Sequence, residues 1–455
     1  MGLQGRNVLV VGLAVSGIPV VETLHRLGAR VGVSDLKTRE ALGPVWDTLS
    51  PMVSEWLLGA HPEHIDHYDL MVLSPGVPTD LPFIRRAAER GMEVIGELEL
   101  AYRLAQGTFI AITGTNGKTT TTALTGEIFR RAGRKTEVVG NIGLPAVARA
   151  LETEVDTVLV TEVSSFQLES CTTFRPRIAA VLNITPDHLN RHKTMENYIA
   201  AKAGVFTRQA GDDVLVLNYD NEPARALAAQ APAKVRFFSR VELQAGFTGV
   251  REGMIVIREP EGDVPVCPAA DLFIPGAHNL ENALAAVTMA YCAGVAPEVI
   301  AEVLRTFQGV EHRIEWVADF KGVRFFNDSK GTNPDSTIKA VEAMKGPTVL
   351  IAGGMDKGSD FDEMIASFGG TVTDLVLLGE TREQIQESAR RAGLHNSVLV
   401  ADVEEAVREA WRRAEAGGNI LLSPACASWD MYPNFEVRGR HFKDSVRALL
   451  AELQA

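Results

Sequence analysis

A glycine-rich segment in the middle of the chain carries the side chains best placed for chemistry. Residues 114–120, with the sequence GTNGKTT, follow the apolar run 108–113 and precede 121–129, which has helical spacing. Strand, glycine-rich turn ending in Lys-Thr, then helix is the context of a phosphate-binding loop. In such a loop the backbone N–H groups face the phosphates, Lys118 meets the β and γ oxygens, and the Thr119 hydroxyl reaches Mg²⁺. The segment predicts binding of ATP or GTP; the alternative is a glycine-rich turn with an incidental lysine.

Other polar residues of the same region lie near the ends of predicted elements. Glu162 ends an apolar strand, and a carboxylate at that end of a sheet that also presents a phosphate loop is suited to bind Mg²⁺. The alternative is a strand-end charge in solvent. His188 follows Asp187 in the turn after the strand 178–182, and a lone histidine on a loop is more often a surface residue than a ligand. Lys202 lies on a predicted amphipathic helix, so its own pattern predicts a solvated lysine.

Three loops toward the C-terminus also follow predicted strands, at 327–334, 352–360 and 423–430. They are rich in small, hydroxyl and cationic residues, and Pro334 fits the first turn of a helix. Loops at the carboxyl ends of strands form ligand sites in α/β sheets. Each loop alone could be a turn, but together they favour a site for a polar, anionic ligand.

The N-terminal region has the pattern of a βαβ unit. Strands are predicted at 6–12 and 30–35, with a helix from about Ser16 between them. Its glycines do not form the dinucleotide fingerprint, so NAD is not expected. Asp35 lies at the tip of the second strand, where carboxylates that contact a ribose or a base are often found, and an exposed turn aspartate is equally compatible. A further strand, 69–74, runs into a Ser-Pro-Gly turn.

Alternating strands and helices predict an α/β protein that positions these residues on three domains. They are a Rossmann-like domain at 1–96, a central P-loop ATPase-like α/β domain at 97–309, and a second Rossmann-like α/β domain at 310–455. The central strands are expected at 108–113, 135–139, 156–161, 178–183 and 213–217, with a β excursion at 247–266 and helices at 278–293 and 296–307. The last domain is expected to hold a hairpin of 314–319 with 323–326, then strands at 348–352, 374–378, 397–400 and 419–422.

The amino-acid composition limits the classes of binding partner that we expect. The 455 residues carry a formal net charge of −13 and no basic tract, which argues against nucleic acid and against an anionic membrane surface. The four cysteines lack metal-binding spacing, which favours a reduced compartment. The apolar stretch 8–21 could pass for a signal-peptide core, but only Arg6 supplies a preceding positive charge and Pro19 interrupts the run. We expect a cytoplasmic monomer with small-molecule partners.

The motifs together resemble the Mur ligase family over the whole chain. The loop 113–119 has the form typical of Mur ligases and folylpolyglutamate synthetases. Five further segments occur in family order, at 140–143, 183–188, 278–279, 311–313 and 327–330. Segments 164–169, 422–428 and 434–439 look like those of the members that add D-glutamate, and nothing resembles the Asp-Asn-Pro-Arg motif of the members that add diaminopimelate or lysine.

The resemblance implies one substrate for each domain. The residues that it matches to the ATP site are Gly114, Thr115, Asn116, Gly117, Lys118, Thr119, Thr120, Asn279, Arg313 and Asp328. Those matched to the UDP-sugar contacts are Leu13, Ala14, Val15, Asp35, Leu36, Lys37, Ser74, Gly76 and Asn141. Those matched to the amino-acid pocket are Lys330, Thr332, Lys357, Ser428, Trp429 and Phe435. Family members often carry a hydroxyl residue where this chain has Ala14 and Val15.

The resemblance also implies two Mg²⁺ ions and three catalytic residues. Thr119 and Glu162 would serve one ion. His188 and Lys202 would serve the other, with Lys202 as a carbamate formed with CO₂, and these two with Lys118 would be the catalytic set. A carbamate turns a cation into an oxygen ligand, which suits a hard metal.

The implied activity is ATP-dependent ligation of D-glutamate to the alanyl carboxylate of UDP-N-acetylmuramoyl-L-alanine through an acyl phosphate, in peptidoglycan precursor synthesis. One alternative is a sister Mur or folylpolyglutamate-type ligase with another acceptor. A nucleotide-gated switch would need the phosphate loop but no third domain with cationic loops. An NAD-linked oxidoreductase is disfavoured by the incomplete dinucleotide fingerprint.

Overall fold

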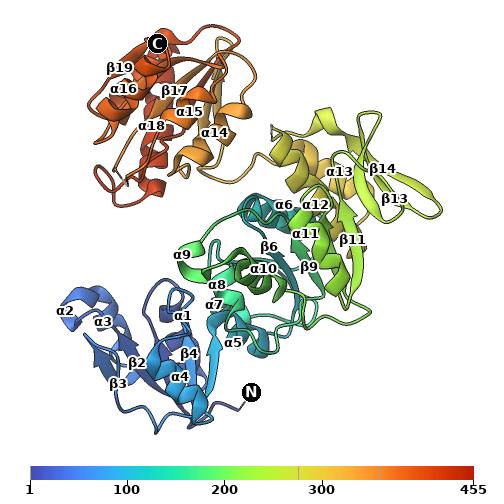
Figure 1. The fold of residues 1–455 in the computed structure, drawn as a ribbon, viewed down its shortest axis with the longest axis vertical. Helices are drawn as coiled ribbons and strands as arrows, with labels where there is room; N and C mark the ends of the chain where they lie inside the picture. The colour runs from blue at the N-terminus through green and yellow to red at the C-terminus, as the bar shows by residue number, and fades with distance from the viewer. Residues whose placement is uncertain (1, 275, 357, 455) are drawn as a thin grey trace. The chain divides into compact units, whose positions relative to one another are not determined.

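The computed structural model of the chain describes residues 2–274, 276–356 and 358–454. It comprises two compact units, each described by itself below. The first contains residues up to Asp271 together with Leu280–Arg305, and the second contains Leu272–Asn279 and the residues from Thr306 onward. Within these units the strands form three sheets, which agrees with the predicted α/β class (Figure 1). The domain boundaries at residues 96 and 309 stay predictions.

The N-terminal sheet is parallel, with the strand order β3-β2-β1-β4-β5. The order reverses at β1, so the loops after β1 and β4 flank the switch point at which ligands bind in such sheets. Two strands were not predicted: β3 is a half-exposed edge strand, and β5 has four residues and starts on a glutamate. The elements in chain order are β1 (Asn7–Val11), α1 (Gly17–Arg26), β2 (Arg30–Asp35), α2 (Arg39–Leu42), α3 (Pro44–Leu49), β3 (Val53–Leu58), β4 (Leu70–Leu73), α4 (Pro82–Glu89) and β5 (Glu93–Gly96).

The second sheet has the order β14-β13-β12-β11-β10-β9-β6-β8-β7. Its strand β6 is buried and leads through the predicted phosphate loop into helix α6. The elements up to β11 are α5 (Glu97–Leu104), β6 (Thr108–Thr113), α6 (Lys118–Arg131), β7 (Thr136–Gly140), α7 (Val147–Ala150), β8 (Val158–Glu162), α8 (Ser165–Leu168), β9 (Ile178–Val181), α9 (Leu189–His192), α10 (Met195–Ala203), β10 (Val214–Asn218), α11 (Glu222–Ala226), η1 (Leu227–Gln230) and β11 (Lys234–Phe238).

The predicted β excursion is an antiparallel extension of this sheet. Strands β13 and β14 pair antiparallel beyond β12, which itself runs parallel to β11. The two helices predicted after it are present as α12 and α13. These elements are β12 (Phe247–Arg251), β13 (Met254–Glu259), β14 (Gly262–Pro268), η2 (Ala269–Asp271), α12 (Ala277–Cys292) and α13 (Pro297–Thr306).

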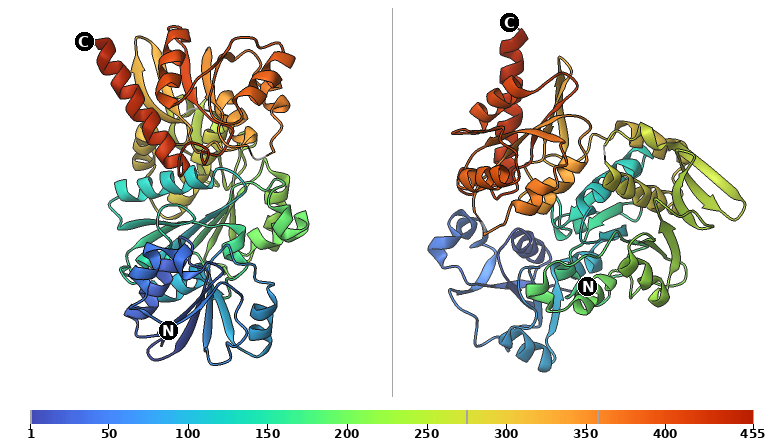
Figure 2. Two further views of the ribbon diagram at one scale, coloured as in Figure 1. Left: turned by 90° about the vertical axis from the view of Figure 1, so that its left-hand side faces the viewer. Right: turned by 45° about the horizontal axis from the view of Figure 1, so that its top comes forward.

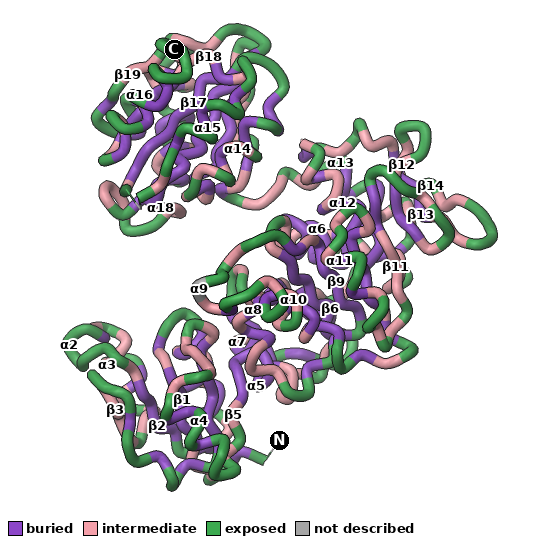
Figure 3. Tube along the Cα trace, viewed as in Figure 1, coloured by how far each residue is buried: buried purple, intermediate pink, exposed green. Residues whose placement is uncertain are grey.

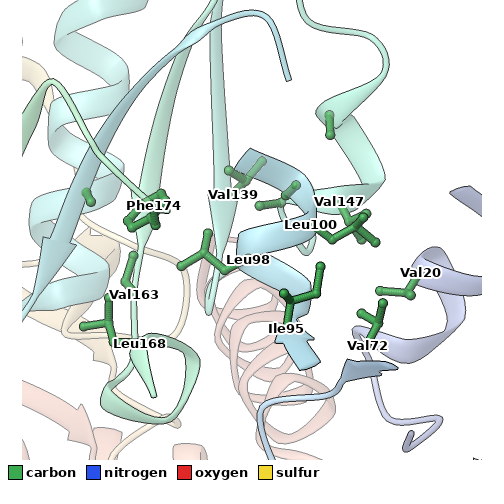
Figure 4. Close-up of a cluster of buried hydrophobic side chains, with 14 of the residues drawn as sticks. Val20, Val72, Ile95, Leu98, Leu100, Val139, Val147, Val163, Leu168 and Phe174 are labelled. Carbon is green, nitrogen blue, oxygen red and sulfur yellow. The ribbon is translucent and has the colours of Figure 1, made fainter. Parts of the chain in front are cut away.

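One hydrophobic core joins the first two sheets. Figure 4 shows this cluster, in which Val20 of α1, Leu98 of α5 and Val147 of α7 belong to the same group of buried side chains. Helix α7 also contacts α1 and α5. The backbone N–H of Val147 donates to Glu97 Oε1 at 2.7 Å, and burial raises the pKa of Glu97 to about 7. The N-terminal sheet is therefore packed firmly onto the sheet that carries the phosphate loop.

The third sheet, in the second unit, has the order β15-β16-β20-β17-β18-β19 and is parallel apart from the β15–β16 hairpin. Alternate residues of β17 enter two different cores, so both faces of the sheet are covered (Figure 3). The long helix α18 packs against α17 and the hairpin (Figure 2). The elements are β15 (Glu315–Phe320), β16 (Val323–Asn327), α14 (Pro334–Glu342), β17 (Thr348–Ala352), α15 (Asp362–Ala366), β18 (Val372–Leu377), α16 (Arg382–Arg391), β19 (Ser397–Leu399), α17 (Val403–Arg413), β20 (Asn419–Leu422) and α18 (Phe435–Gln454). Within the described ranges, none of the helices is both long and apolar enough to cross a membrane.

Candidate active site

The loop between β6 and α6 has the backbone conformation that its glycines predict. Gly117 precedes α6 with a φ of 82°, in the left-handed region that favours glycine, and a Cβ there would lie 2.2 Å from Asn282 Oδ1, so a larger residue would be strained. Asn183, which follows β9, fixes the loop from its other side. Its Oδ1 accepts from the N–H of Asn116 at 2.8 Å, and its Nδ2 donates to the carbonyl of Asn116 at 3.1 Å. The Asn183 side chain thus holds the loop in shape from outside the loop.

Two lysine side chains converge on the carbonyl of Gly114. Lys118 Nζ donates to it at 2.9 Å and to the Thr115 carbonyl at 2.9 Å, and Lys202 Nζ donates to it at 2.7 Å. Lys202 is 1% exposed, so its interpretation as a solvated lysine is wrong. Burial, together with the charge of Lys118, lowers the pKa of Lys202 to about 7. The Lys202 ammonium lies 4.6 Å from the ring centre of Tyr198, one helical turn earlier.

The carboxylate of Glu162 is buried at the end of β8 and only partly satisfied. Its exposure is 2%, which excludes the alternative of a strand-end charge in solvent. Asn141 Nδ2 donates to Oε1 at 2.9 Å, whereas Oε2 is buried with no hydrogen-bond partner among the described residues. A buried, uncompensated carboxylate oxygen is costly unless a cation or a donor reaches it. The residues present therefore fit a bound Mg²⁺, which takes few protein ligands and keeps waters and substrate phosphates around it.

A pocket of about 360 Å³ lies beside the phosphate loop. It brings together five residues of the sequence prediction: Gly76, Lys118, Asn141, His188 and Lys202. Its other lining residues are Pro75, Ser164, Ser165, Phe166 and Tyr198, which the prediction did not assign to a site. Three of these lie in the segment 164–169, directly after the strand that ends in Glu162. That position at the end of a strand could have predicted that they line the site.

His188 lies on a loop held by aromatic contacts. Its φ of 52° is in the left-handed region, which is uncommon for a residue with a side chain and is often found at functional sites. Its side chain is 49% exposed, with Nε2 3.4 Å from Asp187 Oδ2. The ring centre is 5.0 Å from that of Phe166 and 6.5 Å from that of Tyr198. His188 is thus a partly exposed wall of the pocket, with its imidazole available to a ligand.

The predicted UDP-sugar residues of the N-terminal sheet lie at the ends of β1, β2 and β4. Asp35 accepts from the backbone N–H of Leu13 at 2.6 Å and of Lys37 at 2.8 Å, so it joins the loops after β1 and β2. Ser74 Oγ donates to the carbonyl of Gly12 at 2.7 Å. The loops after β1 and β2 each present an aliphatic side chain to solvent: Val15 is 77% exposed and Leu36 is 63% exposed. Ala14 is exposed as well.

In the second unit, Asp328 is the most unusual of the predicted nucleotide residues. It is buried, and its carboxylate accepts from Ser423 Oγ at 2.7 Å and from the N–H of Ile314 at 3.2 Å. Burial raises the pKa of Asp328 to about 7, against the opposing effect of Arg313. Arg313 Nε is buried and has no hydrogen-bond partner in the part of the chain that the structure describes, so it can donate to a ligand. Asn279 is also buried.

The predicted amino-acid pocket is spread over the loops that follow β16 and β20 and the start of α18. Lys330 Nζ lies 5.7 Å from the ring centre of Phe435. Ser428 is 2% exposed, whereas Trp429 is 63% exposed and Thr332 is half-buried. Lys357, predicted in the same pocket, lies outside the described residues.

Comparison with known protein families matches three consecutive parts of the chain. The Mur ligase MurD-like N-terminal domain matches residues 6–96, the Mur ligase middle domain matches 112–290, and the Mur ligase glutamate ligase domain matches 312–426. The chain belongs to the Mur ligase family. The three matched domains of this Mur ligase follow the three sheets in order, which confirms the predicted three-domain α/β fold.

Full-length relatives share about half of its residues. The chain is 53% identical over 452 residues to the UDP-N-acetylmuramoylalanine--D-glutamate ligase of Alkaliphilus oremlandii, which covers 99% of this chain and 100% of the relative. It is 50% identical over 451 residues to the protein of the same name from Clostridioides difficile, with 99% and 100% covered.

Solved structures of other Mur ligases share its fold. The UDP-N-acetylmuramate-alanine ligase MurC of Thermotoga maritima matches with a TM-score of 0.61 at 17% identity, covering 97% of this chain and 99% of that chain. MurF of Acinetobacter baumannii matches with a TM-score of 0.61 at 17% identity, covering 96% and 93%.

Proposed function

We propose that this Mur ligase joins the amine of D-glutamate to the alanyl carboxylate of UDP-N-acetylmuramoyl-L-alanine and converts ATP to ADP and phosphate, as a step in peptidoglycan precursor synthesis. Relatives at 53% and 50% identity over the full chain bear the name of this activity. In the structure, the observation that carries the proposal is the pocket in which Lys118 and Lys202 converge on the phosphate loop.

The reaction proceeds in two steps. A carboxylate is a poor electrophile, so an oxygen of the alanyl carboxylate first attacks the γ-phosphorus of ATP, the bond to ADP breaks, and an acyl phosphate forms. The uncharged amine of D-glutamate then attacks the acyl carbon, and the tetrahedral intermediate loses a proton and expels phosphate. Lys118 turns from the loop carbonyls toward the transferring phosphoryl group, whose developing charge it stabilises.

We propose that the residues around the phosphate loop hold two Mg²⁺ ions. Glu162, with its unsatisfied Oε2, and the Thr119 hydroxyl at the start of α6 hold one ion. His188 and a carbamate of Lys202, both on the wall of the pocket, hold the other. When bound, Mg²⁺ supplies positive charge that neutralises the phosphate oxygens.

Carbamylation of Lys202 is supported by its environment. Carbamates form only from the neutral amine, and a pKa of about 7 leaves a large fraction of Lys202 neutral near neutral pH. The side chain is buried at the phosphate loop, with the Lys118 ammonium as a neighbour. A negative carbamate is favoured beside that cation, whereas the ammonium form of Lys202 is not.

In this proposal each of the three substrates binds to its own group of residues. The UDP-sugar is held by Asn141, by the turn with Ser74 and Gly76, and by the loops of Leu13 to Val15 and Asp35 to Lys37. The ATP phosphates lie on the loop 114–120, and Asn279, Arg313 and Asp328 hold the adenine and ribose.

The acceptor pocket is proposed on the third sheet, formed by Lys330, Thr332, Lys357, Ser428, Trp429 and Phe435. D-Glutamate brings two carboxylates, which separated cations and hydroxyl donors bind well. We also propose a cytoplasmic location, because the four cysteines are free thiols, as is usual in a reducing compartment.

An assay of ADP release tests the proposal. With ATP, Mg²⁺ and UDP-N-acetylmuramoyl-L-alanine, we expect ADP to form at a high rate only when D-glutamate is added, together with the amide product. L-Glutamate and a diamino acid serve as controls, because inverting the α-carbon displaces the amine or a carboxylate. Equal use of either control would overturn the assignment in favour of a sister ligase, and ADP release without ligation would indicate a nucleotide switch.

A further inference from the structure

A buried arginine of α18, Arg438, contacts two loops that carry residues of the proposed acceptor pocket. Its exposure is 2%, and its guanidinium makes four hydrogen bonds to two loops. Nε donates to Ser329 Oγ at 3.0 Å and Nη2 to the Ser329 carbonyl at 2.9 Å. Nη2 also donates to the carbonyl of Cys426 at 3.1 Å, and Nη1 to that of Ala427 at 3.3 Å. These partners directly precede Lys330 in one loop and Ser428 in the other.

The third loop is attached to the same group. The carbonyl of Ala427 also accepts from the N–H of Met355 at 2.9 Å, and the carbonyl of Pro424 accepts from the N–H of Gly353 at 2.8 Å. A Cβ at Gly354 would lie 2.2 Å from the Ala427 carbonyl and 3.2 Å from Arg438 Nη1, so only glycine fits there. The three strand-end loops of the sheet are thus joined through the carbonyls that face one guanidinium.

The hydrogen bonds that the structure describes for Arg438 all go to uncharged oxygens. Within the described part of the chain, no carboxylate pairs with it at salt-bridge distance, and its partners are neutral oxygens. Its burial is costly enough to lower the pKa of Arg438 to about 10, yet the group stays charged near neutral pH. A buried positive charge among neutral carbonyls makes the surrounding loops more favourable for an anion.

We propose that Arg438 is a positioning residue that sets the spacing of Lys330 and Ser428 for a dicarboxylic amino acid and adds positive potential to their pocket. The proposal rests on the proposed acceptor pocket. A planar fork is needed because the four bonds leave from three separate nitrogens, whereas a lysine ammonium has three donors on one nitrogen and cannot keep all four.

Two substitutions of Arg438 separate its effect on the position of the loops from its effect on the charge near the pocket. Arg438→Lys keeps the charge but loses the fork, and Arg438→Met loses both. We expect Arg438→Lys to raise the KM for D-glutamate by about tenfold and Arg438→Met by more, with the KM for the UDP-sugar substrate within about twofold of wild type. If the larger changes prevent folding, Ser329→Ala is a milder test, because it removes one of the four hydrogen-bond acceptors of Arg438. We expect it to raise the KM for D-glutamate by a smaller factor.

Cysteine labelling gives a readout that needs no substrate. Cys426 is 3% exposed, and we expect its thiol to be protected from iodoacetamide in the native wild type. In Arg438→Met its loop is released, so mass spectrometry should find that the peptide with Cys426 is labelled. Arg447→Met, at an exposed arginine of the same helix, is the matched control and should leave both KM and labelling unchanged.

The outcomes are distinguishable. If wild type shows no D-glutamate-dependent ligation, the proposed function fails, and the labelling still tests the connection between the loops. If wild type ligates D-glutamate but Arg438→Lys and Arg438→Met keep its KM and a protected Cys426, the role of Arg438 is refuted. A fall in kcat with every KM unchanged would also contradict it, because that result indicates general structural damage.

Discussion

Two buried cations, Lys202 in the first unit and Arg438 in the second, differ in their hydrogen bonds and in their pKa values. Within the described residues, Lys202 donates one hydrogen bond, to the Gly114 carbonyl, and shares that acceptor with Lys118. Arg438 has four bonds to carbonyls and a hydroxyl. The pKa of Lys202 falls to about 7, whereas that of Arg438 falls only to about 10. Burial lowers both pKa values from different ordinary values, and neighbouring groups add to the difference. The charge of Lys118 lowers the pKa of Lys202 further, whereas acidic groups such as Asp430 oppose the effect of burial on Arg438.

This difference matches two tasks. A lysine that is poorly solvated and lies beside another cation is inclined to lose its proton, which prepares it for covalent chemistry with CO₂. A guanidinium with its donors occupied is chemically inert and fixes the geometry of the groups around it. In the proposed mechanism, the same fold thus contains a reactive cation at the phosphate loop and a structural one in contact with the proposed acceptor loops.

The largest effect is expected for Lys118→Ala. Removing the cation beside the transferring phosphoryl group should lower the rate by about a hundredfold or more. The chain should still fold, because a loop lysine supports no hydrophobic core. Steady-state kinetics with a parallel thermal melt measure both. Near-normal ligation in a variant that melts normally would contradict the role of the phosphate loop.

Lys202→Ala should be nearly inactive, because the proposed metal ligand is lost. A short-chain carboxylate added to the buffer should restore part of the activity by occupying the space of the carbamate. Arg438→Met is the contrasting variant, and the same carboxylate should not rescue it, since its defect lies in loop geometry. Rescue of both variants, or of neither, in the ADP-release assay would remove the distinction between the two cations.

A moderate effect is expected for Ser428→Ala. Ser428 follows the two carbonyls that Arg438 holds, and its hydroxyl is proposed to contact D-glutamate. Its loss should raise the KM for D-glutamate more than that for ATP, by a factor of about ten, which is the contribution of one hydrogen bond to a charged group. Equal changes in the two KM values would argue that Ser428 has only a structural role.

The smallest effect is expected in how the stability of the folded protein depends on pH. Because the pKa of Lys202 is lowered from 10.5 to about 7, the unfolded chain binds more protons than the folded chain between these values. The contribution of Lys202 to stability therefore rises with pH across this window and is least favourable below it. In buffer free of CO₂, where Lys202 stays an amine, Lys202→Met should raise the melting temperature relative to wild type more near pH 7 than near pH 10. A difference that is independent of pH would mean that Lys202 keeps its ordinary pKa.

The sequence predicted the buried strands better than the exposed ones. The bounds of β2, β6, β17 and β20 were predicted to the residue, because their apolar runs end at polar or glycine-rich loops. Strands β3, β5 and β11 were missed, since β3 and β11 mix charged and apolar residues and β5 is short. The β excursion after β11 was located but its strands were not resolved.

The candidate site was predicted unevenly for a related reason. The phosphate loop is local in sequence, so its residues could be found from spacing alone. The burial of Lys202 depends on its packing against a loop 88 residues away, which no helical pattern contains. The links from Arg438 to Ser329 span 109 residues, so its position in the motif 434–439 gave no sign of its partners.

The state of Lys202 can be observed directly by ¹³C NMR of the protein in ¹³C-labelled bicarbonate near neutral pH. We predict a carbamate carbon signal that grows with dissolved CO₂, disappears in Lys202→Met and persists in Arg438→Met. The absence of this signal in active wild-type enzyme, or its persistence in Lys202→Met, would contradict the proposal that Lys202 is the reactive cation of the phosphate-loop pocket.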